Sequence, residues 1–201
     1  MSINHYFSDS AGDDLQPREI TASLVGKAVK VFTSSGVFSP DHIDLGTEVL
    51  LQQLDKIKPS GNILDLGCGW GPIALAIALT APEAKVAAVD VNQKSLSLTR
   101  MNAEKLNLKN ITTFLPEQVP TELLFDEIWS NPPIRVGKEV LHEILVLWLN
   151  RLSVGGTARL VVQKHLGSDS LEKWLRQNFP NFEVTRVTSE KNFRVIKLVR
   201  N

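Results

Sequence analysis

The chain has 201 residues, 43% of them hydrophobic, which is enough to fill one core, so we expect a single domain. Lysine plus arginine and aspartate plus glutamate number 22 each, which excludes the overall positive charge that drives non-specific nucleic-acid binding. Cys68 is the single cysteine, so we expect no internal disulfide, no metal site and a cytoplasmic location. Neither a signal peptide nor an apolar run long enough to span a bilayer is evident, and we expect no membrane association.

Residues 1–60 differ in pattern from the rest of the chain. They contain a strand-like run at 28–32, a turn at 34–36 and a helical pattern at 47–57, whereas the first twenty or so residues show no regular pattern. We expect this segment to cap or cover a sheet built by the later residues, as part of the same domain.

Beyond residue 60, short β-rich runs alternate with longer helical stretches, which is typical of crossover units on a parallel sheet. The predicted strands are 62–66, 85–89, 111–114, 125–129 and 157–163, and the predicted helices are 72–80, 93–106, 138–152 and 170–178. Gly155 and Gly156 are predicted to form a turn, and 182–187 with 193–199 an antiparallel hairpin. The fold class is therefore α/β, with residues 61–201 as its core.

A glycine-rich loop comes directly after the first of these strands. Gly67, Gly69 and Gly71 lie between a predicted strand and a predicted helix, where glycine lets the backbone approach a ligand closely. Asp90 ends the next strand, about 20 residues further on, where a carboxylate can accept both hydroxyl hydrogens of an adenosine ribose. The simpler alternatives are a tight strand-to-helix turn and a solvated aspartate.

Two details of this loop favour S-adenosyl-L-methionine over a dinucleotide. The spacing Gly67-x-Gly69-x-Gly71 lacks the longer second gap of the dinucleotide motif, and Asp65 stands two positions before the first glycine. A carboxylate would repel a pyrophosphate but would suit the ammonium group of a methionine.

Three successive motifs resemble those of class I methyltransferases: Asp65-x-Gly67-x-Gly69-x-Gly71, Asp90-Val91-Asn92 and Asn131-Pro132-Pro133-Ile134. Together with 5–8, 36–39, 44–47 and 131–137, they make the chain similar to the methyltransferase-small family, which includes the RsmC-like guanine methyltransferases of small-subunit ribosomal RNA. The resemblance implies a Rossmann-like methyltransferase fold, a mostly parallel seven-stranded sheet with helices on both faces. It also implies that S-adenosyl-L-methionine lies over the carboxyl ends of the strands.

The predicted cofactor site combines these motifs with three further segments. The resemblance implies that Phe38, Asp44 and Thr47 close over the methionine end of the cofactor; the alternative is a turn residue and helix caps. Glu117 can accept from the adenine amine while Leu115 lies at the adenine face, in a register that Pro116 leaves open. The full predicted set is Phe38, Thr47, Asp65, Gly67, Cys68, Gly69, Gly71, Asp90, Val91, Asn92, Leu115, Glu117 and Asn131.

The Asn131-Pro132-Pro133-Ile134 loop is the predicted catalytic segment. The Asn131 side-chain oxygen and the Pro132 carbonyl can both accept hydrogen bonds from one amino group and aim its nitrogen at the methyl group, while Ile134 packs beside the target. Family members with an aromatic residue in place of Ile134 can stack on a flat substrate, whereas isoleucine offers an apolar face alone. As an alternative, Asn-Pro-Pro simply breaks the strand.

These residues predict an N-methyltransferase, with the exocyclic amino group of a guanine in small-subunit ribosomal RNA as the leading acceptor. Ribosomal RNA or the small ribosomal subunit is thus the expected partner. Basic residues in 185–201, and Arg135 and Lys138 beside the loop, could hold phosphates or could be a solvated face. Two rival hypotheses remain: a protein glutamine methyltransferase, and a domain that binds the cofactor without catalysis.

Overall fold

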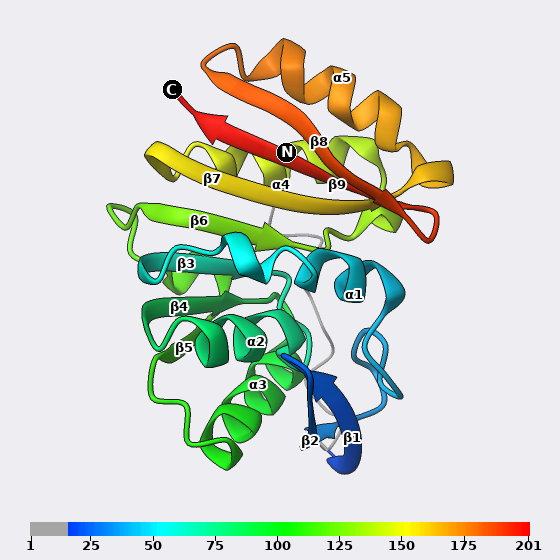
Figure 1. The fold of residues 1–201 in the computed structure, drawn as a ribbon, viewed down its shortest axis with the longest axis vertical. Coiled ribbons are helices and arrows are strands. Elements are labelled where there is room, and N and C mark those ends of the chain that lie inside the picture. Colours follow the sequence, from blue (N-terminus) through cyan, green and yellow to red (C-terminus); the bar gives the residue numbers. More distant parts are fainter. Residues whose placement is uncertain (1–15) are drawn as a thin grey trace.

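A seven-stranded sheet forms the centre of the computed structural model, which describes residues 16–201; segment 5–8 lies outside them (Figure 1). The strand order is β5-β4-β3-β6-β7-β9-β8. Neighbouring strands from β5 to β7 run parallel, and β9 is antiparallel to both β7 and β8. The predicted mostly parallel sheet with a C-terminal hairpin is confirmed. Its strands are β3 (Ser60–Leu66), β4 (Glu83–Val89), β5 (Ile111–Phe114), β6 (Phe125–Ser130), β7 (Leu152–Gln163), β8 (Phe182–Glu190) and β9 (Phe193–Arg200).

Helices cover both faces of this sheet because successive side chains of its strands point to opposite sides. Ile63 and Trp129 are fully buried in one core with helices α1, α2 and α3, whereas the adjacent Leu64 and Ile128 are buried in a second core with α4 and α5. Figure 1 shows α1 and α2 in front of the sheet and α4 behind it. The helices are α1 (Leu45–Leu51), α2 (Pro72–Thr80), α3 (Gln93–Lys105), α4 (Lys138–Leu149) and α5 (Ser168–Asn178).

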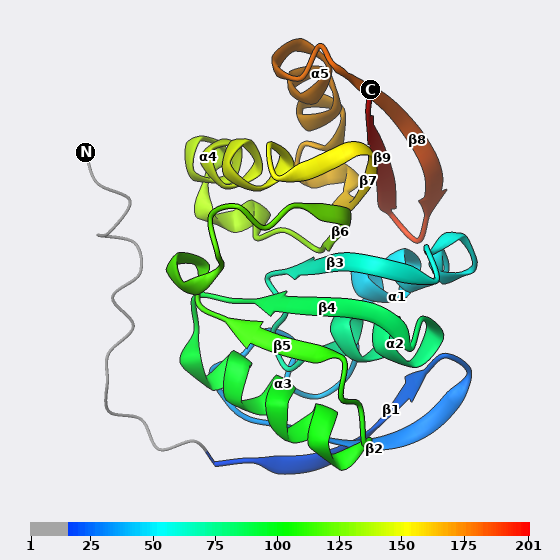
Figure 2. The ribbon, with the colours of Figure 1, turned by 90° about the vertical axis from the view of Figure 1, so that its left-hand side faces the viewer.

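A separate antiparallel hairpin, β1 (Arg18–Leu24) and β2 (Lys27–Thr33), packs beside α3 (Figure 2). Asn102 of α3 ties the hairpin down, because its side chain accepts from the Phe32 amide at 2.6 Å and donates to the Phe32 carbonyl at 2.8 Å. Strand β2 was predicted at 28–32, but β1 was not predicted. The turn between them is Val25-Gly26, in which the valine adopts a positive φ of 50°, rare for a β-branched residue.

Several predicted boundaries were wrong. The helix predicted at 138–152 ends at Leu149, and Gly155-Gly156 lies inside β7 rather than between elements. From Phe125 to Glu127 of β6, the partner on β7 advances from Leu152 to Thr157, so the glycines fall in an irregular stretch of a paired strand. The helix predicted at 47–57 is likewise shorter: α1 spans Leu45–Leu51, and a separate 3-10 turn covers Leu54–Lys56.

The strand order reverses direction at β3. The chain adds β4 and β5 on one side of β3 and then returns to add β6 and β7 on the other. In open α/β sheets, ligands bind outside the carboxyl ends of the strands at such a switch point. The glycine loop follows β3, Asp90 follows β4 and Asn131 follows β6, so the topology brings the three sequence motifs to this edge.

Candidate active site

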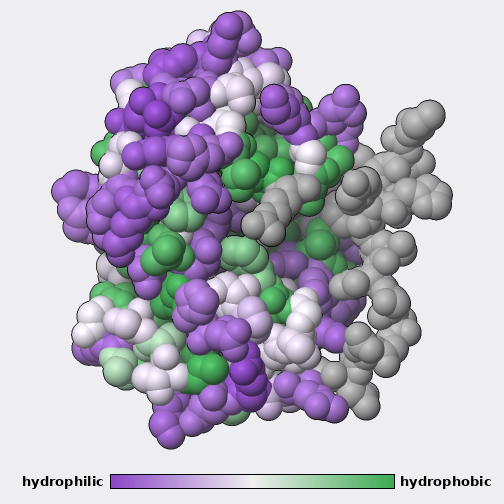
Figure 3. All heavy atoms as spheres, turned by 90° about the vertical axis from the view of Figure 1, so that its right-hand side faces the viewer, coloured by the Kyte–Doolittle hydropathy of each residue, from purple (hydrophilic) through white to green (hydrophobic). Residues whose placement is uncertain are grey.

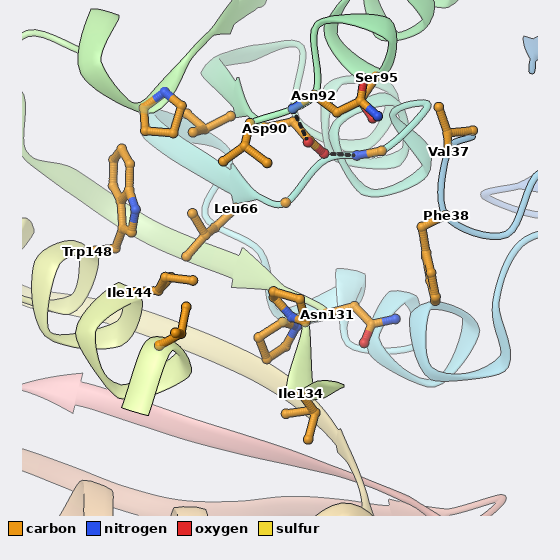
Figure 4. Close-up of a pocket in the computed structure, with 18 of the residues that line it drawn as sticks. Val37, Phe38, Leu66, Asp90, Asn92, Ser95, Asn131, Ile134, Ile144 and Trp148 are labelled. Carbon is orange, nitrogen blue, oxygen red and sulfur yellow. Dashed lines mark hydrogen bonds between the residues drawn. The ribbon is translucent and has the colours of Figure 1, made fainter. Parts of the chain in front are cut away.

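A cavity of about 680 Å³ lies over the carboxyl ends of β3, β4, β6 and β7 (Figure 4). Gly67 and Gly69 of the glycine loop, Asp90 and Asn131 line it. In Figure 4, Phe38 lies on one side of Asn131, and Ile144 and Trp148 lie across the cavity from Phe38. Its apolar lining comes from α4, from the segment at Phe38, from the loop at Asn131 and from the ends of β3 and β4. These residues are Val37, Phe38, Leu66, Val89, Val91, Pro132, Pro133, Ile134, Val140, Ile144, Leu147 and Trp148.

Asp90 faces the cavity from the end of β4. Its carboxylate accepts from the backbone amides of Gly69 and Asn92, both at 2.9 Å (Figure 4). Burial raises the pKa of Asp90, and these two hydrogen bonds oppose the rise. The Val91 amide and the Ser95 side chain also lower this pKa by hydrogen bonding, so a ligand hydroxyl would take the position of one of these donors on the carboxylate.

The glycine loop has the backbone that a ligand cradle requires. Gly67 and Gly69 have φ values of 80° and 57°, and a Cβ atom at either position would meet nothing within 4 Å. Glycine is favoured there by conformation, and the space above it stays open for a ligand. Gly71 is needed for close packing instead, because a Cβ atom built there would lie 2.9 Å from Oγ1 of Thr99 on α3.

Asp65 and Cys68 are buried beneath this loop and do not line the main cavity. The Asp65 Oδ2 atom accepts from the backbone amide of Ala74 at 2.8 Å, within the first turn of α2, whereas Oδ1 has no partner among the described residues. Burial raises the pKa of Asp65 to about 8, with a smaller contribution from the charge of Asp90. Cys68 borders a small second pocket with Thr47 and Asn131, and burial raises the pKa of its thiol.

The raised pKa of Asp65 predicts a pH-dependent stability for the cofactor-free protein. Because the folded value of about 8 exceeds the ordinary value of 3.8, ionisation favours the unfolded chain. The stabilisation that the buried, protonated Asp65 gives to the folded state is fully present below pH 3.8 and is lost as pH rises toward 8. Urea unfolding between about pH 6 and 8 should show stability falling by up to about 1.4 kcal/mol per pH unit. Asp65→Asn, which keeps an acceptor for Ala74, should remove this slope; an equal slope in the variant would contradict the assignment.

Asn131 is held by residues from a distant part of the chain. Its Nδ2 atom donates to Oδ2 of Asp44 at 2.9 Å and to Oγ1 of Thr47 at 3.1 Å. A carboxylate can only accept hydrogen bonds, so Asp44 fixes which end of the amide is nitrogen and leaves Oδ1 of Asn131 unpaired with these groups. The same Asp44 oxygen caps α1 by accepting from the amides of Gly46 and Thr47.

We expect Asp44 to position Asn131, and Asp44→Ser separates this role from the capping of α1. Serine also caps helices well, so the thermal midpoint should change little, but its shorter side chain does not reach Asn131. The methyl transfer predicted from the sequence should fall by about 10- to 100-fold because the Asn131 amide can rotate. Asp44→Asn retains an acceptor oxygen and should keep most activity. Initial rates beside thermal melts test this, and a Ser variant as active as the wild type would count against it.

The rest of the predicted catalytic segment lies along the cavity wall. Pro132, Pro133 and Ile134 all line it, but the Pro132 carbonyl already accepts from the Ile134 amide at 2.8 Å, leaving one of its lone pairs for a ligand. Phe38, 65% exposed, also lines the cavity. Its segment is anchored on both sides, since Asn92 Nδ2 donates to the Gly36 carbonyl at 3.2 Å and Trp70 Nε1 to the Ser39 carbonyl at 3.1 Å.

Val91, a predicted cofactor contact, and the predicted adenine contacts Leu115 and Glu117 lie differently relative to the cavity. Val91 lines the cavity and is 44% exposed, whereas Leu115 packs against the core and Glu117 is exposed, and neither lines the cavity. Pro116, between them, does line it. The roles predicted for Leu115 and Glu117 thus remain predictions.

Sequence reasoning missed much of the far wall of the cavity. Val140, Ile144, Leu147 and Trp148 come from α4, where helical periodicity predicted a helix and gave no sign of a ligand. Leu147 is 51% exposed, which distinguishes it from a core residue only once the structure is known. Gln163, Leu166 and Phe193 complete the lining from the ends of β7 and β9.

Much of the basic C-terminal segment is occupied by intramolecular contacts. Arg186 pairs with Asp169 and Glu172 of α5, and Arg194 also pairs with Asp169. Lys191 pairs with Glu48, at 3.4 Å. Figure 3 shows that the upper part of the molecule, where Figure 1 places α5 and β8, is largely hydrophilic on this face. The ion pairs favour the alternative of a solvated, internally paired face over a phosphate-binding surface.

No helix among residues 16–201 is long and apolar enough to cross a membrane. In the same part of the chain, no three His, Cys, Asp or Glu side chains gather as a metal site.

The strand order, the glycine cradle and the carboxylate at the end of β4 define a Rossmann-like methyltransferase fold with a site suited to S-adenosylmethionine. Residues 28–197 match the family described as "Methyltransferase small domain", and the chain belongs to this family. The protein YbxB of Bacillus subtilis is 32% identical over 196 residues, covering 96% of each chain.

Relatives with a stated activity are longer. "Ribosomal RNA small subunit methyltransferase C" of Shewanella loihica is 31% identical over 162 residues, covering 78% of this chain and 45% of its own. The solved structure of the T. thermophilus 16S rRNA N2 methyltransferase RsmC, in complex with AdoMet and guanosine, is 26% identical with a TM-score of 0.78, covering 92% of this chain and 51% of that one. The chain thus spans about half the length of these ribosomal RNA methyltransferases. It has the family and the fold of S-adenosylmethionine-dependent methyltransferases and is related to these enzymes.

Proposed function

We propose that this protein methylates the exocyclic amino group of a guanine in small-subunit ribosomal RNA. The observation that carries the proposal is the orientation of Asn131, whose amide nitrogen is held by Asp44 and Thr47. Its oxygen is then available as an acceptor at the carboxyl end of β6, beside the glycine loop. The likeness to ribosomal RNA methyltransferases supports the same acceptor.

The residues suit the task of holding cofactor and acceptor together. S-adenosylmethionine, when bound, supplies an electrophilic methyl group on its sulfonium. Asp90 would accept from the ribose hydroxyls, and the open loop at Gly67 and Gly69 would accommodate the chain of the methionine. The apolar residues of α4 that line the same cavity, among them Ile144, would pack against the adenine.

Catalysis in this proposal comes from alignment. An exocyclic amine is a weak nucleophile because its lone pair is delocalised into the ring. By accepting the amine hydrogens, Asn131 Oδ1 and the Pro132 carbonyl would fix the nitrogen and stabilise the positive charge that develops on it. The proton can leave after methyl transfer, so the first step needs no general base.

The test is transfer of a labelled methyl group to ribosomes from a strain that lacks this protein. We expect label in small-subunit RNA, located in a methylated guanine by nucleoside analysis. Label in protein would favour the glutamine methyltransferase, since a carboxamide presents the same pair of hydrogens to Asn131. Cofactor binding without label in any fraction would favour a non-catalytic domain. The proposal includes a cytoplasmic location, where ribosomal RNA and a reduced Cys68 are expected.

A further inference from the structure

The acceptor end of the cavity lacks an aromatic residue in the catalytic loop. Position 134 is isoleucine, which offers no ring to a flat acceptor. The cavity nevertheless reaches a wall at the ends of β7 and β9, where Gln163 and Phe193 line it with Leu166. A role for this wall rests on the proposed function, because it concerns the acceptor that lies against Asn131.

The Phe193 ring is held near Asn131 through helix α1. A Cβ atom built on Gly46 would lie 2.8 Å from Cε1 and 3.0 Å from Cδ1 of Phe193, so the ring edge lies directly against this glycine. Gly46 stands two positions after Asp44, whose carboxylate holds the Asn131 amide at 2.9 Å. Phe193 is only partly buried, so part of its ring remains accessible from the cavity.

Gln163 is the direct partner of Phe193 across two antiparallel strands. Side chains of such a pair project from the same face of the sheet, about 5 Å apart at Cβ. The Gln163 side chain is partly buried, lines the same cavity, and makes no hydrogen bond to the residues that the structure describes. A carboxamide in this position offers both a donor and an acceptor to a ligand.

We propose that Phe193 and Gln163 form an acceptor wall that binds a purine base, with Phe193 against the base and Gln163 at its hydrogen-bonding edge. A purine presents an apolar ring together with neighbouring donors and acceptors, which this pair matches. The rival acceptor, a glutamine side chain of a substrate protein, has no ring to stack, so an aromatic wall would add little to its binding. The wall therefore favours the nucleobase over the carboxamide.

The test measures guanosine binding in the presence of S-adenosylhomocysteine by calorimetry. Phe193→Leu keeps apolar volume but removes the ring, and should weaken guanosine binding about 10-fold. Phe193→Tyr keeps an aromatic ring and should bind guanosine about as tightly as the wild type does. Gln163→Leu should weaken binding about 5- to 10-fold by removing the edge contacts. Gln177→Leu, the same change on the exposed side of α5, is the matched control and should bind as the wild type does.

Cofactor affinity and thermal melts establish that each variant is folded, and affinity for S-adenosylmethionine should stay within about twofold. The wall is refuted if wild-type protein does not bind guanosine, if both leucine variants bind it normally, or if they lose cofactor and guanosine affinity equally. Failure of the proposed function has another signature: the wild type would bind guanosine in this wall-dependent way yet leave ribosomal RNA unlabelled.

Discussion

Asn131→Ala should reduce methyl transfer by about 100-fold or more while changing affinity for S-adenosylmethionine only a few-fold. The side chain is assigned to the acceptor, and misplacing a weak nucleophile by about 1 Å can cost this much when catalysis depends on orientation. Calorimetric titration of the cofactor and initial rates with unmethylated small subunits measure the two effects separately. Thermal melting must first show that the variant is folded.

Asn131→Asp is the more specific test of the orientation seen here. It would place a second carboxylate where Nδ2 now donates to Asp44 at 2.9 Å, so two like charges would face each other. We expect lower activity than for the wild type, together with a lower thermal midpoint that recovers when Asp44 is changed to Asn. If folded Asn131→Ala turns over near the wild-type rate, the acceptor is held elsewhere.

Asp90→Ala should weaken cofactor binding by about 2–4 kcal/mol, because it removes the charged acceptor assigned to the two ribose hydroxyls. It also removes the acceptor for the amides of Gly69 and Asn92, so some loss of loop order is expected. Asp90→Asn keeps an oxygen for one of these amides and should lie between the alanine variant and the wild type.

Calorimetric titration with S-adenosylmethionine, beside thermal melts of the cofactor-free variants, separates the direct contact from the effect on the loop. Unchanged cofactor affinity in Asp90→Ala would refute the placement of the adenosine at the end of β4. Equal affinities for Asp90→Asn and Asp90→Ala, at equal stability, would show that the negative charge itself is what the ligand requires.

Local patterns were sufficient for the core of the fold. Each predicted strand from 62–66 onward overlaps an observed one, and helix α2 was predicted with its observed ends, 72–80. Buried strands and amphipathic helices leave a periodic signal because their own residues face the core. The errors fell where tertiary pairing overrides that signal. Gly155 and Gly156 lie in an irregular stretch of β7, but β7 pairs with β6 both before them, at Leu152, and after them, at Thr157, so they belong to one strand.

For the site, the sequence by itself determined the residues that come directly after strands: the glycine loop, Asp90 and Asn131. Parallel strands end at one edge, so the loops after them must meet. Only the tertiary structure decided which other side chains contact them. Asp44 precedes Asn131 by 87 positions, yet their side chains are hydrogen-bonded. Gln163 and Phe193 face the same cavity because two antiparallel strands pair in one register, and a register is a property of the assembled sheet, not of either strand alone.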